Sequence, residues 1–316
     1  MLNNKLLKNL EKLLGAGRVE RNKNLFQYLT LRTKTVAEYF FDAKTREDLI
    51  KITTVRQEYN LPVFFLGGGS NLALVKNILN GLVVKNSYQK FEVISEDDNF
   101  VELLVSSGYP VSRLVQQTVE KGYEGFEYQK GLPGTVGGAI YMNSKWTRPV
   151  SYFSDSLINV NIVDAKGAER NEKKSYFQFA YDFSILQKTK EIVLEAVFRI
   201  KKVSPDVLAK RAKEAFEYRL KTQPFGVATS GCFFRNIPEK IKKEKNLPTT
   251  SAGYLVDKAG LKGYTVGDFI VSEKHANFIL NKGNGKPEDL VKLVSIIKSK
   301  VKEKFGVELK EEVIII

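Results

Sequence analysis

The sequence predicts an α+β protein, because segments with the apolar spacing of helices occur along the same chain as short runs typical of strands. Two glycine-rich clusters, Leu66–Asn71 and Gly131–Asn143, interrupt these segments. With 316 residues, the chain is long enough for two or three domains of roughly 100–200 residues each. We therefore expect several domains and a specific task for the glycine clusters.

The Gly131–Asn143 cluster reads GLPGTVGGAIYMN, with four glycines and a proline in its first eight residues. Glycine adopts positive φ angles and lets the backbone approach a ligand, so this density indicates a specified backbone path. The other cluster, LGGGSN, directly follows Pro62–Phe65, an apolar run typical of a buried strand. A strand followed by glycines and Ser or Asn presents backbone N–H groups to phosphate oxygens. We predict that the two loops bind one extended phosphate-bearing cofactor from two sides.

Five segments have the apolar spacing or the terminal residues of helices. In the first of them, leucines at helical spacing favour a helix that packs on its own domain over one that lies on a membrane surface or a partner. Proline at the start, with Gly122 just past the end of the third, fits the usual asymmetry of helix ends. The predicted helices are Met1–Leu14, Thr45–Asn60, Pro110–Lys121, Ser204–Lys221 and Pro287–Phe305.

Seven runs read as strands, and four of them form two hairpins around turn-rich centres. The predicted strands are Pro62–Leu66, Gly81–Lys85, Phe91–Ser95, Phe100–Ser106, Leu157–Val163, Ala168–Asn171 and Ile192–Ile200. Near the C-terminus, Val271–Leu280 reads as a strand or a strand and turn, and Val307–Ile316 as a β-like tail. Lys240–Lys245 is a charged loop or a helix surface.

The composition of the sequence argues against a membrane-spanning protein, a signal peptide and an internal disulfide. The sequence has no apolar run of the ~18 residues that a membrane span needs, and no apolar region typical of a signal peptide. Its single cysteine excludes an internal disulfide and fits a reducing cytoplasm. The net charge of +14 is concentrated between Lys201 and Lys245, where twelve Lys/Arg and five Asp/Glu give +7. This region either binds an anionic ligand or is a solvated surface, and no motif of a nucleic-acid-binding module accompanies it.

Individual residues give weak signals for chemistry. His275 is the only histidine, so a multi-histidine metal site is impossible, and a structural role fits it better than catalysis. Cys232 lies between Gly231 and Phe233 and is either a small buried side chain or, as a thiol with a reference pKa of about 8.5, a proton donor. Glu312 alone reads as a surface acid of the tail.

Seven motifs occur in one order along the chain. They are GGGSN, GLPGTVGGAIYMN, a Tyr-x-x-Ser at Tyr181–Ser184, SGCFFRN, SAGYLVDKAGLKG, KHANF and a terminal Glu-Val. In this order they resemble the UDP-N-acetylenolpyruvoylglucosamine reductase family, flavoenzymes of bacterial peptidoglycan precursor synthesis. The resemblance covers roughly Asn24 to Val313, nearly the whole chain.

The resemblance implies a two-lobed FAD-binding domain of the vanillyl-alcohol-oxidase type, followed by an α+β substrate-binding domain. The implied parts are an N-terminal helix (1–23), FAD-binding lobes 1 (24–84) and 2 (85–203), the substrate domain (204–305) and a catalytic tail (306–316). FAD would be bound without a covalent link. The implied FAD-binding residues are Gly67, Gly68, Gly69, Ser70, Asn71, Leu132, Pro133, Gly134, Thr135, Gly137 and Gly138.

The implied reaction has two half-steps in one pocket. NADPH would reduce FAD, and the flavin would then pass hydride to the enolpyruvyl group of the UDP-sugar to give UDP-N-acetylmuramate. Hydride addition leaves an enolate-like intermediate that needs charge stabilisation and a proton. Cys232 stands where the family has a serine proton donor, and Glu312 matches a glutamate that aids the same step. Tyr181, Arg235 and Asn236 would contact the substrate, with no metal, nucleic acid or membrane involved, in a cytoplasmic monomer.

Four departures from the family pattern accompany these matches. Asp182 stands where the family places an arginine beside the enolate, so Arg235 or a nearby lysine compensates or the aspartate faces elsewhere. The other three are Lys34–Thr35 for Gly-Gly, Ser144–Lys145–Trp146 for Ala-Gly-Ala-Tyr-Gly after Asn143, and a proline displaced to Pro238.

Two further functions stay open: an FAD oxidoreductase of the same fold with another substrate, and a non-catalytic flavin- or nucleotide-binding protein.

Overall fold

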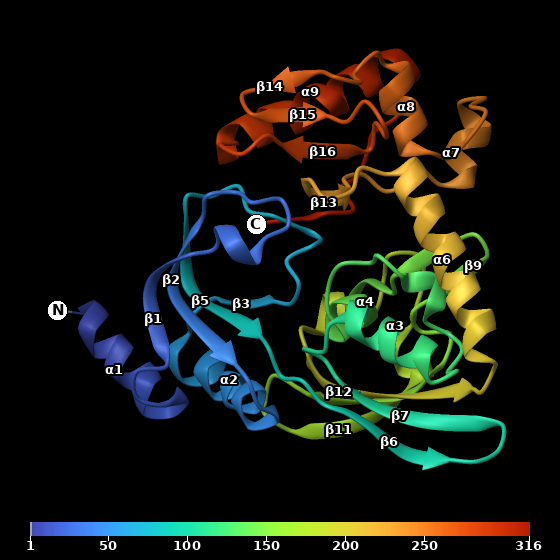
Figure 1. Cartoon of the computed structure of the whole chain (residues 1–316). Helices are drawn as coiled ribbons and strands as arrows, with labels where there is room; N and C mark the ends of the chain where they lie inside the picture. The colour runs from blue at the N-terminus through green and yellow to red at the C-terminus, as the bar shows by residue number, and fades with distance from the viewer. Residues whose placement is uncertain (1) are drawn as a thin grey trace. The chain divides into compact units, whose positions relative to one another are not determined.

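The computed structural model describes residues 2–316, with side chains from Lys5 onward. The chain forms two compact units (Figure 1). The first unit comprises the chain up to Lys23, Glu38–Gly68 and Asn80–Arg219, and the second comprises Asn24–Ala37, Gly69–Leu79 and Leu220–Ile316. The domain boundaries inferred from the sequence stay predictions. None of the helices in residues 2–316 is long and apolar enough to cross a membrane.

The first lobe of the first unit is built on a four-stranded sheet with the order β1–β2–β5–β3, in which β3 and β5 are parallel. Leu10 of the first helix and Leu49 and Ile52 of the second share a buried core with Tyr39 and Phe41 of β2. The predicted helices and strands of this region are confirmed. Their bounds are α1 (Leu2–Leu14), β1 (Val19–Asn24), β2 (Val36–Ala43), α2 (Arg46–Tyr59), β3 (Val63–Leu66) and β5 (Ile78–Asn86).

The second lobe is an antiparallel sheet in the order β11–β10–β12–β7–β6. Two helices, α3 and α4, lie on one face of it (Figure 1), and Phe126, Phe153 and Phe198 pack edge to face or tilted in the core beneath them. Both predicted hairpins are confirmed. The bounds are β6 (Phe91–Glu96), β7 (Phe100–Ser106), α3 (Val111–Glu120), α4 (Val136–Met142), β10 (Leu157–Val163), β11 (Glu169–Lys173) and β12 (Ile192–Lys201).

The interpretation of the Gly131–Asn143 cluster as a loop is wrong for its second half, because Val136–Met142 forms α4. Thr135 caps this helix, since its side chain accepts a hydrogen bond from the Gly138 N–H at 3.5 Å. Val136 and Ile140 are buried in the core of the lobe. Capping and burial therefore outweigh the low helix propensity of the two glycines.

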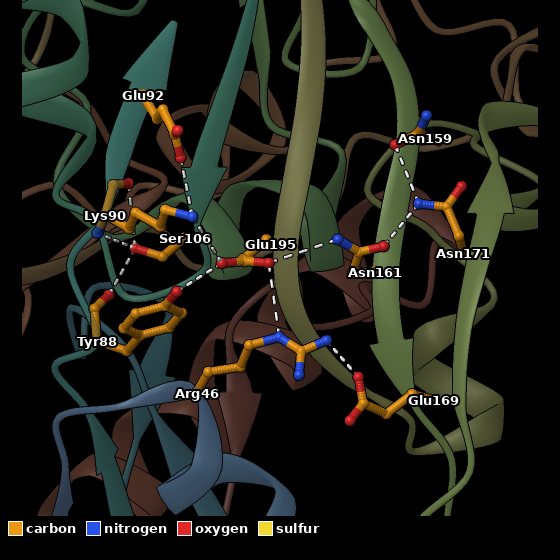
Figure 2. Close-up of polar contacts among 10 residues, drawn as sticks. All are labelled: Arg46, Tyr88, Lys90, Glu92, Ser106, Asn159, Asn161, Glu169, Asn171 and Glu195. Carbon is orange, nitrogen blue, oxygen red and sulfur yellow. Dashed lines mark hydrogen bonds and ion pairs between the residues drawn. The ribbon is translucent and has the colours of Figure 1, made fainter. Parts of the chain in front are cut away.

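A buried carboxylate connects the two lobes of the first unit (Figure 2). Glu195 of β12 accepts a hydrogen bond of 2.5 Å from the Tyr88 hydroxyl, and its other oxygen lies 3.6 Å from Nε of Arg46 in α2. Burial and the bond to Glu195 raise the pKa of Tyr88, so its hydroxyl stays a donor at neutral pH. The charge of Glu195 is thus paired and hydrogen-bonded, as a buried carboxylate requires.

The second unit contains an antiparallel sheet in the order β13–β16–β15–β14, which packs with α8 and α9 (Figure 1). For Val271–Leu280 the strand-and-turn interpretation is confirmed, and α9 has the predicted bounds. Glu239–Glu244 is a short helix, α7, which settles the open assignment of Lys240–Lys245. The other bounds are β13 (Ala228–Cys232), α8 (Ala252–Lys258), β14 (Thr265–Val266), β15 (Phe269–Val271), β16 (Phe278–Asn281) and α9 (Pro287–Phe305).

The C-terminal tail is strand-like only at its end. Ile314 and Ile315 form β17, parallel to Leu72–Ala73 of β4. The remaining short elements are η1 (Phe26–Tyr28), η2 (Glu127–Gln129), β8 (Lys145–Thr147), β9 (Val150–Tyr152), η3 (Lys174–Phe177), α5 (Leu186–Thr189) and the longer α6 (Pro205–Thr222).

Asp48→Asn tests the start of α2. The Asp48 carboxylate accepts bonds from Arg18 at 2.7 and 2.8 Å and from the backbone N–H of Lys44 and Thr45. Burial alone would raise the pKa of Asp48, but these hydrogen bonds outweigh it and hold that pKa below its ordinary value. We expect the variant to lose about 1–3 kcal/mol of unfolding free energy at pH 7, measured by urea denaturation.

The same carboxylate sets a pH dependence. Because the folded-state pKa is lowered, its stabilisation is complete above the unfolded pKa of about 4 and disappears as the pH falls through the folded value. The difference between parent and Asp48→Asn should therefore narrow below about pH 4. Asp206→Asn, an exposed acid in the first turn of α6, is the control, with an expected change below about 0.5 kcal/mol. Equal losses in the two variants would contradict the assignment.

Candidate flavin and substrate site

The two glycine clusters touch each other through their backbones in the first unit. A Cβ on Gly68 would lie 2.4 Å from Cα of Gly134, and a Cβ on Gly67 would lie 2.6 Å from Oγ1 of Thr135. Real Cβ atoms essentially never come so close to another heavy atom. Only glycine therefore permits this contact, which brings together two loops about sixty residues apart.

The start of α4 is held by the loop before α3. The N–H of Gly137 donates to the Ser107 carbonyl at 2.8 Å, and the N–H of Val136 donates to the Tyr109 carbonyl at 2.9 Å. A Cβ on Gly137 would lie 2.9 Å from Cβ of Ser107. The backbone path of the second cluster is thus fixed on both sides.

Lys85 is a residue at the glycine loops that the sequence analysis did not single out. It stands at the end of β5, and its Nζ donates to the Gly67 carbonyl at 2.7 Å. Burial lowers the pKa of this ammonium, and the charge of Asp42 opposes that effect only in part. The one feature of the sequence that could have pointed to Lys85 is its position at the end of the apolar run GLVVK.

Gly69 and Asn71 belong to the second unit. Gly69 has a φ of +64°, and a Cβ there would lie 2.0 Å from the Tyr28 carbonyl oxygen. The Gly69 carbonyl accepts a hydrogen bond from the Thr30 N–H at 3.1 Å. The Asn71 side chain donates to the Glu312 carbonyl at 3.2 Å, so this loop is connected to the C-terminal tail.

The tail also lies beside Cys232. This half-buried cysteine ends β13, and the carbonyl of the next residue, Phe233, accepts a hydrogen bond from the Glu312 N–H at 2.9 Å. Asn277 fixes the same segment, because its side chain exchanges two hydrogen bonds of 2.8 and 2.9 Å with the Phe234 backbone. The second unit thus brings Asn71, Cys232 and Glu312 to one place.

Arg235 and Asn236 continue this segment. The Arg235 N–H donates to the Lys310 carbonyl at 2.8 Å, and its buried Nε has no hydrogen-bond partner among residues 2–316. The Asn236 side-chain oxygen accepts from the Ala252 N–H at 3.1 Å and so caps α8. Its amide nitrogen remains the atom with which this exposed residue can contact a ligand.

Tyr181 and Asp182 lie in a turn between Ala180 and Phe183, which pair as a bridge. Asp182 has a φ of +50° and is buried, whereas Tyr181 is 39% exposed. Nζ of Lys145 lies 5.5 Å from the centre of the Tyr181 ring. The turn therefore presents the tyrosine to solvent and encloses the aspartate.

His275 is engaged in a hydrogen bond and a ring contact within the protein. Its Nδ1 accepts a hydrogen bond from the Asn277 N–H at 3.2 Å, and its ring packs on Phe278 at 4.9 Å. Burial lowers the pKa of His275, which keeps the imidazole neutral at pH 7. Within residues 2–316 no group of three His, Cys, Asp or Glu is placed to hold a metal ion.

Comparison with known proteins identifies the family. The FAD binding domain family matches residues 37–171, and the C-terminal domain of UDP-N-acetylenolpyruvoylglucosamine reductase matches residues 223–316. The reductase of Chlamydia trachomatis serovar L2 is 35% identical over 94% of this chain and 96% of its own length. The chain belongs to the UDP-N-acetylenolpyruvoylglucosamine reductase family. The Protochlamydia amoebophila reductase is 34% identical over 88% of this chain and 87% of that protein.

Solved structures agree with this assignment. The crystal structure of the Thermus caldophilus reductase is 28% identical, covers 94% of this chain and 98% of that one, and superposes with a TM-score of 0.76. A vanillyl-alcohol-oxidase-type flavoprotein of Myceliophthora thermophila shares the fold alone, with 9% identity and a TM-score of 0.53 over 95% of this chain and 78% of its own. The predicted family and fold class are confirmed.

This reductase is an FAD-containing oxidoreductase, a UDP-N-acetylmuramate dehydrogenase of peptidoglycan precursor synthesis. Its glycine loops fit that cofactor. Gly67, Gly68 and Gly134 let the two loops pack backbone against backbone, and glycine-rich loops of this kind present N–H groups that can bind a diphosphate.

Gly68→Ala tests the contact between the loops. The added Cβ overlaps the Gly134 backbone, which cannot rotate away, so we expect the apoprotein to lose about 1–3 kcal/mol of stability. Thermal unfolding of apoprotein gives this value, and the flavin absorbance retained on purification should fall with it. Gly138→Ala, in α4 of the other cluster, is the control for stability, because its Cβ would meet Thr135 at an ordinary 3.6 Å. A stable apoprotein with Gly68→Ala would show that the loops do not need this close approach.

Proposed function

We propose that this reductase holds FAD, without a covalent link, through Gly67–Asn71 and the loop of Leu132, Pro133, Gly134, Thr135, Gly137 and Gly138. We further propose NADPH as the reductant and Cys232 as the proton donor. The observation that carries the proposal is the hydrogen bond between the Glu312 N–H and the carbonyl of Phe233, the neighbour of Cys232. It places the two proposed catalytic residues on adjacent backbone segments of one unit.

FAD held by these two loops would supply the redox chemistry of the reaction, the passage of hydride from NADPH to the enolpyruvyl double bond. The protein contributes the binding of its phosphates. Backbone N–H groups of the two glycine loops that have no acceptor within the described part of the protein would donate to the diphosphate oxygens. Lys85 fixes the Gly67 carbonyl and adds a positive charge near the same loop.

Cys232 and Glu312 complete the reaction. The Cys232 thiol donates its proton to the substrate carbon next to the carboxylate, after hydride has added to the neighbouring carbon. A thiol is a stronger acid than the serine hydroxyl of the family, so cysteine can take over this task. Glu312 assists the same protonation step.

Tyr181, Arg235 and Asn236 contact the UDP-sugar. The buried Nε of Arg235, which has no hydrogen-bond partner among the residues that the structure describes, supports this role, because guanidinium N–H groups match phosphate oxygens. The net positive charge of the Lys201–Lys245 segment also favours binding of the dianionic diphosphate of the UDP-sugar. We propose a cytoplasmic monomer that uses neither metal nor nucleic acid.

Family membership favours this function over an FAD oxidoreductase with another substrate. The flavin spectrum of the unmodified enzyme distinguishes these two functions. This spectrum should bleach with NADPH under anaerobic conditions and return on addition of the UDP-enolpyruvyl sugar. Bleaching without return would move the substrate into doubt, and a protein that cannot be reconstituted with FAD would overturn the proposal.

Cys232→Ala should keep its flavin and its rate of reduction by NADPH. Re-oxidation by the UDP-enolpyruvyl sugar should slow by about 10²–10⁴-fold, because a general acid is lost. Cys232→Ser, which restores the residue of the family, should recover most of the rate. Stopped-flow absorbance measures both half-reactions, and an alanine variant with the parent rate would disprove the assignment of the proton donor.

A further inference from the structure

The hairpin β8–β9 stands where the sequence departs from the family after Asn143. It is held in place by Trp146, a residue only 4% exposed, whose indole N–H donates to the Arg148 carbonyl at 2.6 Å. The Arg219 guanidinium lies 4.7 Å from the centre of the Trp146 ring, and the Tyr218 ring meets it edge to face at 6.0 Å. The direction of this hairpin is therefore fixed.

Lys145 is the neighbour of Trp146 on β8, so its side chain points to the opposite face. There its Nζ lies 5.4 Å from the ring centre of Tyr152 and 5.5 Å from that of Tyr181. Two tyrosine faces thus hold one ammonium group by cation–π contact. In the part of the chain that the structure describes, Lys145 takes part in none of the ion pairs, so no carboxylate neutralises it.

Hydrogen bonds fix the turn of Tyr181 to the segment that carries Lys145. The Asn143 side chain donates to the Ala180 carbonyl at 3.1 Å, and the Ser184 hydroxyl donates to the Tyr141 carbonyl at 2.7 Å. Lys145 and Tyr181 consequently keep their relative positions. Lys145 thus supplies a cation beside Tyr181 of this turn, whereas Lys188 packs on Phe183 at its other end and Asp182 between them is an acid.

We propose that Lys145 binds the carboxylate of the enolpyruvyl group and stabilises the negative charge that hydride addition places on it. The inference rests on the proposed function, since Tyr181 is there a substrate contact. An enolate forming beside this turn requires a positive charge, which Asp182 cannot supply. The half-buried, un-neutralised ammonium of Lys145 can supply it from the adjacent hairpin.

The test compares three variants in anaerobic stopped-flow absorbance. Lys145→Met keeps the aliphatic stem and removes the charge, whereas Lys145→Arg keeps the charge. Lys188→Met is the matched control, because Lys188 also packs on an aromatic ring of this segment, with Nζ 5.3 Å from the ring centre of Phe183. Lys145→Met should slow flavin re-oxidation by the UDP-enolpyruvyl sugar about 10²–10³-fold and leave reduction by NADPH within about twofold of the parent.

Two further readouts separate a charge effect from a structural one. Lys145→Arg should recover the re-oxidation rate to within about tenfold of the parent, and Lys188→Met should match the parent within about twofold. Titration of oxidised enzyme with the UDP-enolpyruvyl sugar should give a dissociation constant at least about tenfold higher for Lys145→Met. Should this variant lose flavin or unfold, Lys145→Gln replaces it in the same comparison with Lys145→Arg.

The inference is overturned if the uncharged variant re-oxidises within about threefold of the parent, or if Lys145→Arg is no faster than it. Failure of the proposed function gives a different result. In that case the parent enzyme, once reduced by NADPH, is not re-oxidised by the sugar at all.

Discussion

Direct contact between the Gly68 and Gly134 backbones is the constraint on which the flavin-binding unit depends. A side chain on Gly68 would separate the end of β3 from the loop before α4, because its Cβ would lie 2.4 Å from Cα of Gly134. Glycine makes the unfolded chain more flexible and therefore costs stability. The unit recovers this cost through the buried cores of its two lobes and through Glu195, whose hydrogen bonds connect them (Figure 2).

In the second unit, the C-terminal tail has the corresponding role. Its backbone forms hydrogen bonds with Phe233 and with Asn71, two residues far apart in the sequence. A side chain near a free chain end would be poorly positioned, since the last residues of a domain fray unless they are bound. Parallel pairing of β17 with β4 binds this end and fixes Glu312 just before it.

Two of the four departures from the family pattern, Asp182 and the hairpin after α4, lie close together in the first unit. Asp182 is a buried acid at a positive φ, and the hairpin carries Lys145, whose Nζ lies beside Tyr181 of the same turn. If Lys145 contacts the substrate, its positive charge compensates for the negative charge of Asp182. The effect of a charge on a reaction depends on its distance from the reacting atoms. A substitution at one position can thus be balanced by another about forty residues away.

The sequence by itself determined what local interactions decide. The helix Arg46–Tyr59 was predictable from the helical spacing of its apolar residues, and the glycine clusters from their composition. Seven ordered motifs further indicated the family and the candidates Cys232 and Glu312. Tertiary structure alone decided that Val136–Met142 is helical, that the tail pairs with β4, and that Lys85 and Lys145 stand beside functional segments. These outcomes depend on contacts between residues distant in sequence, which no local pattern encodes.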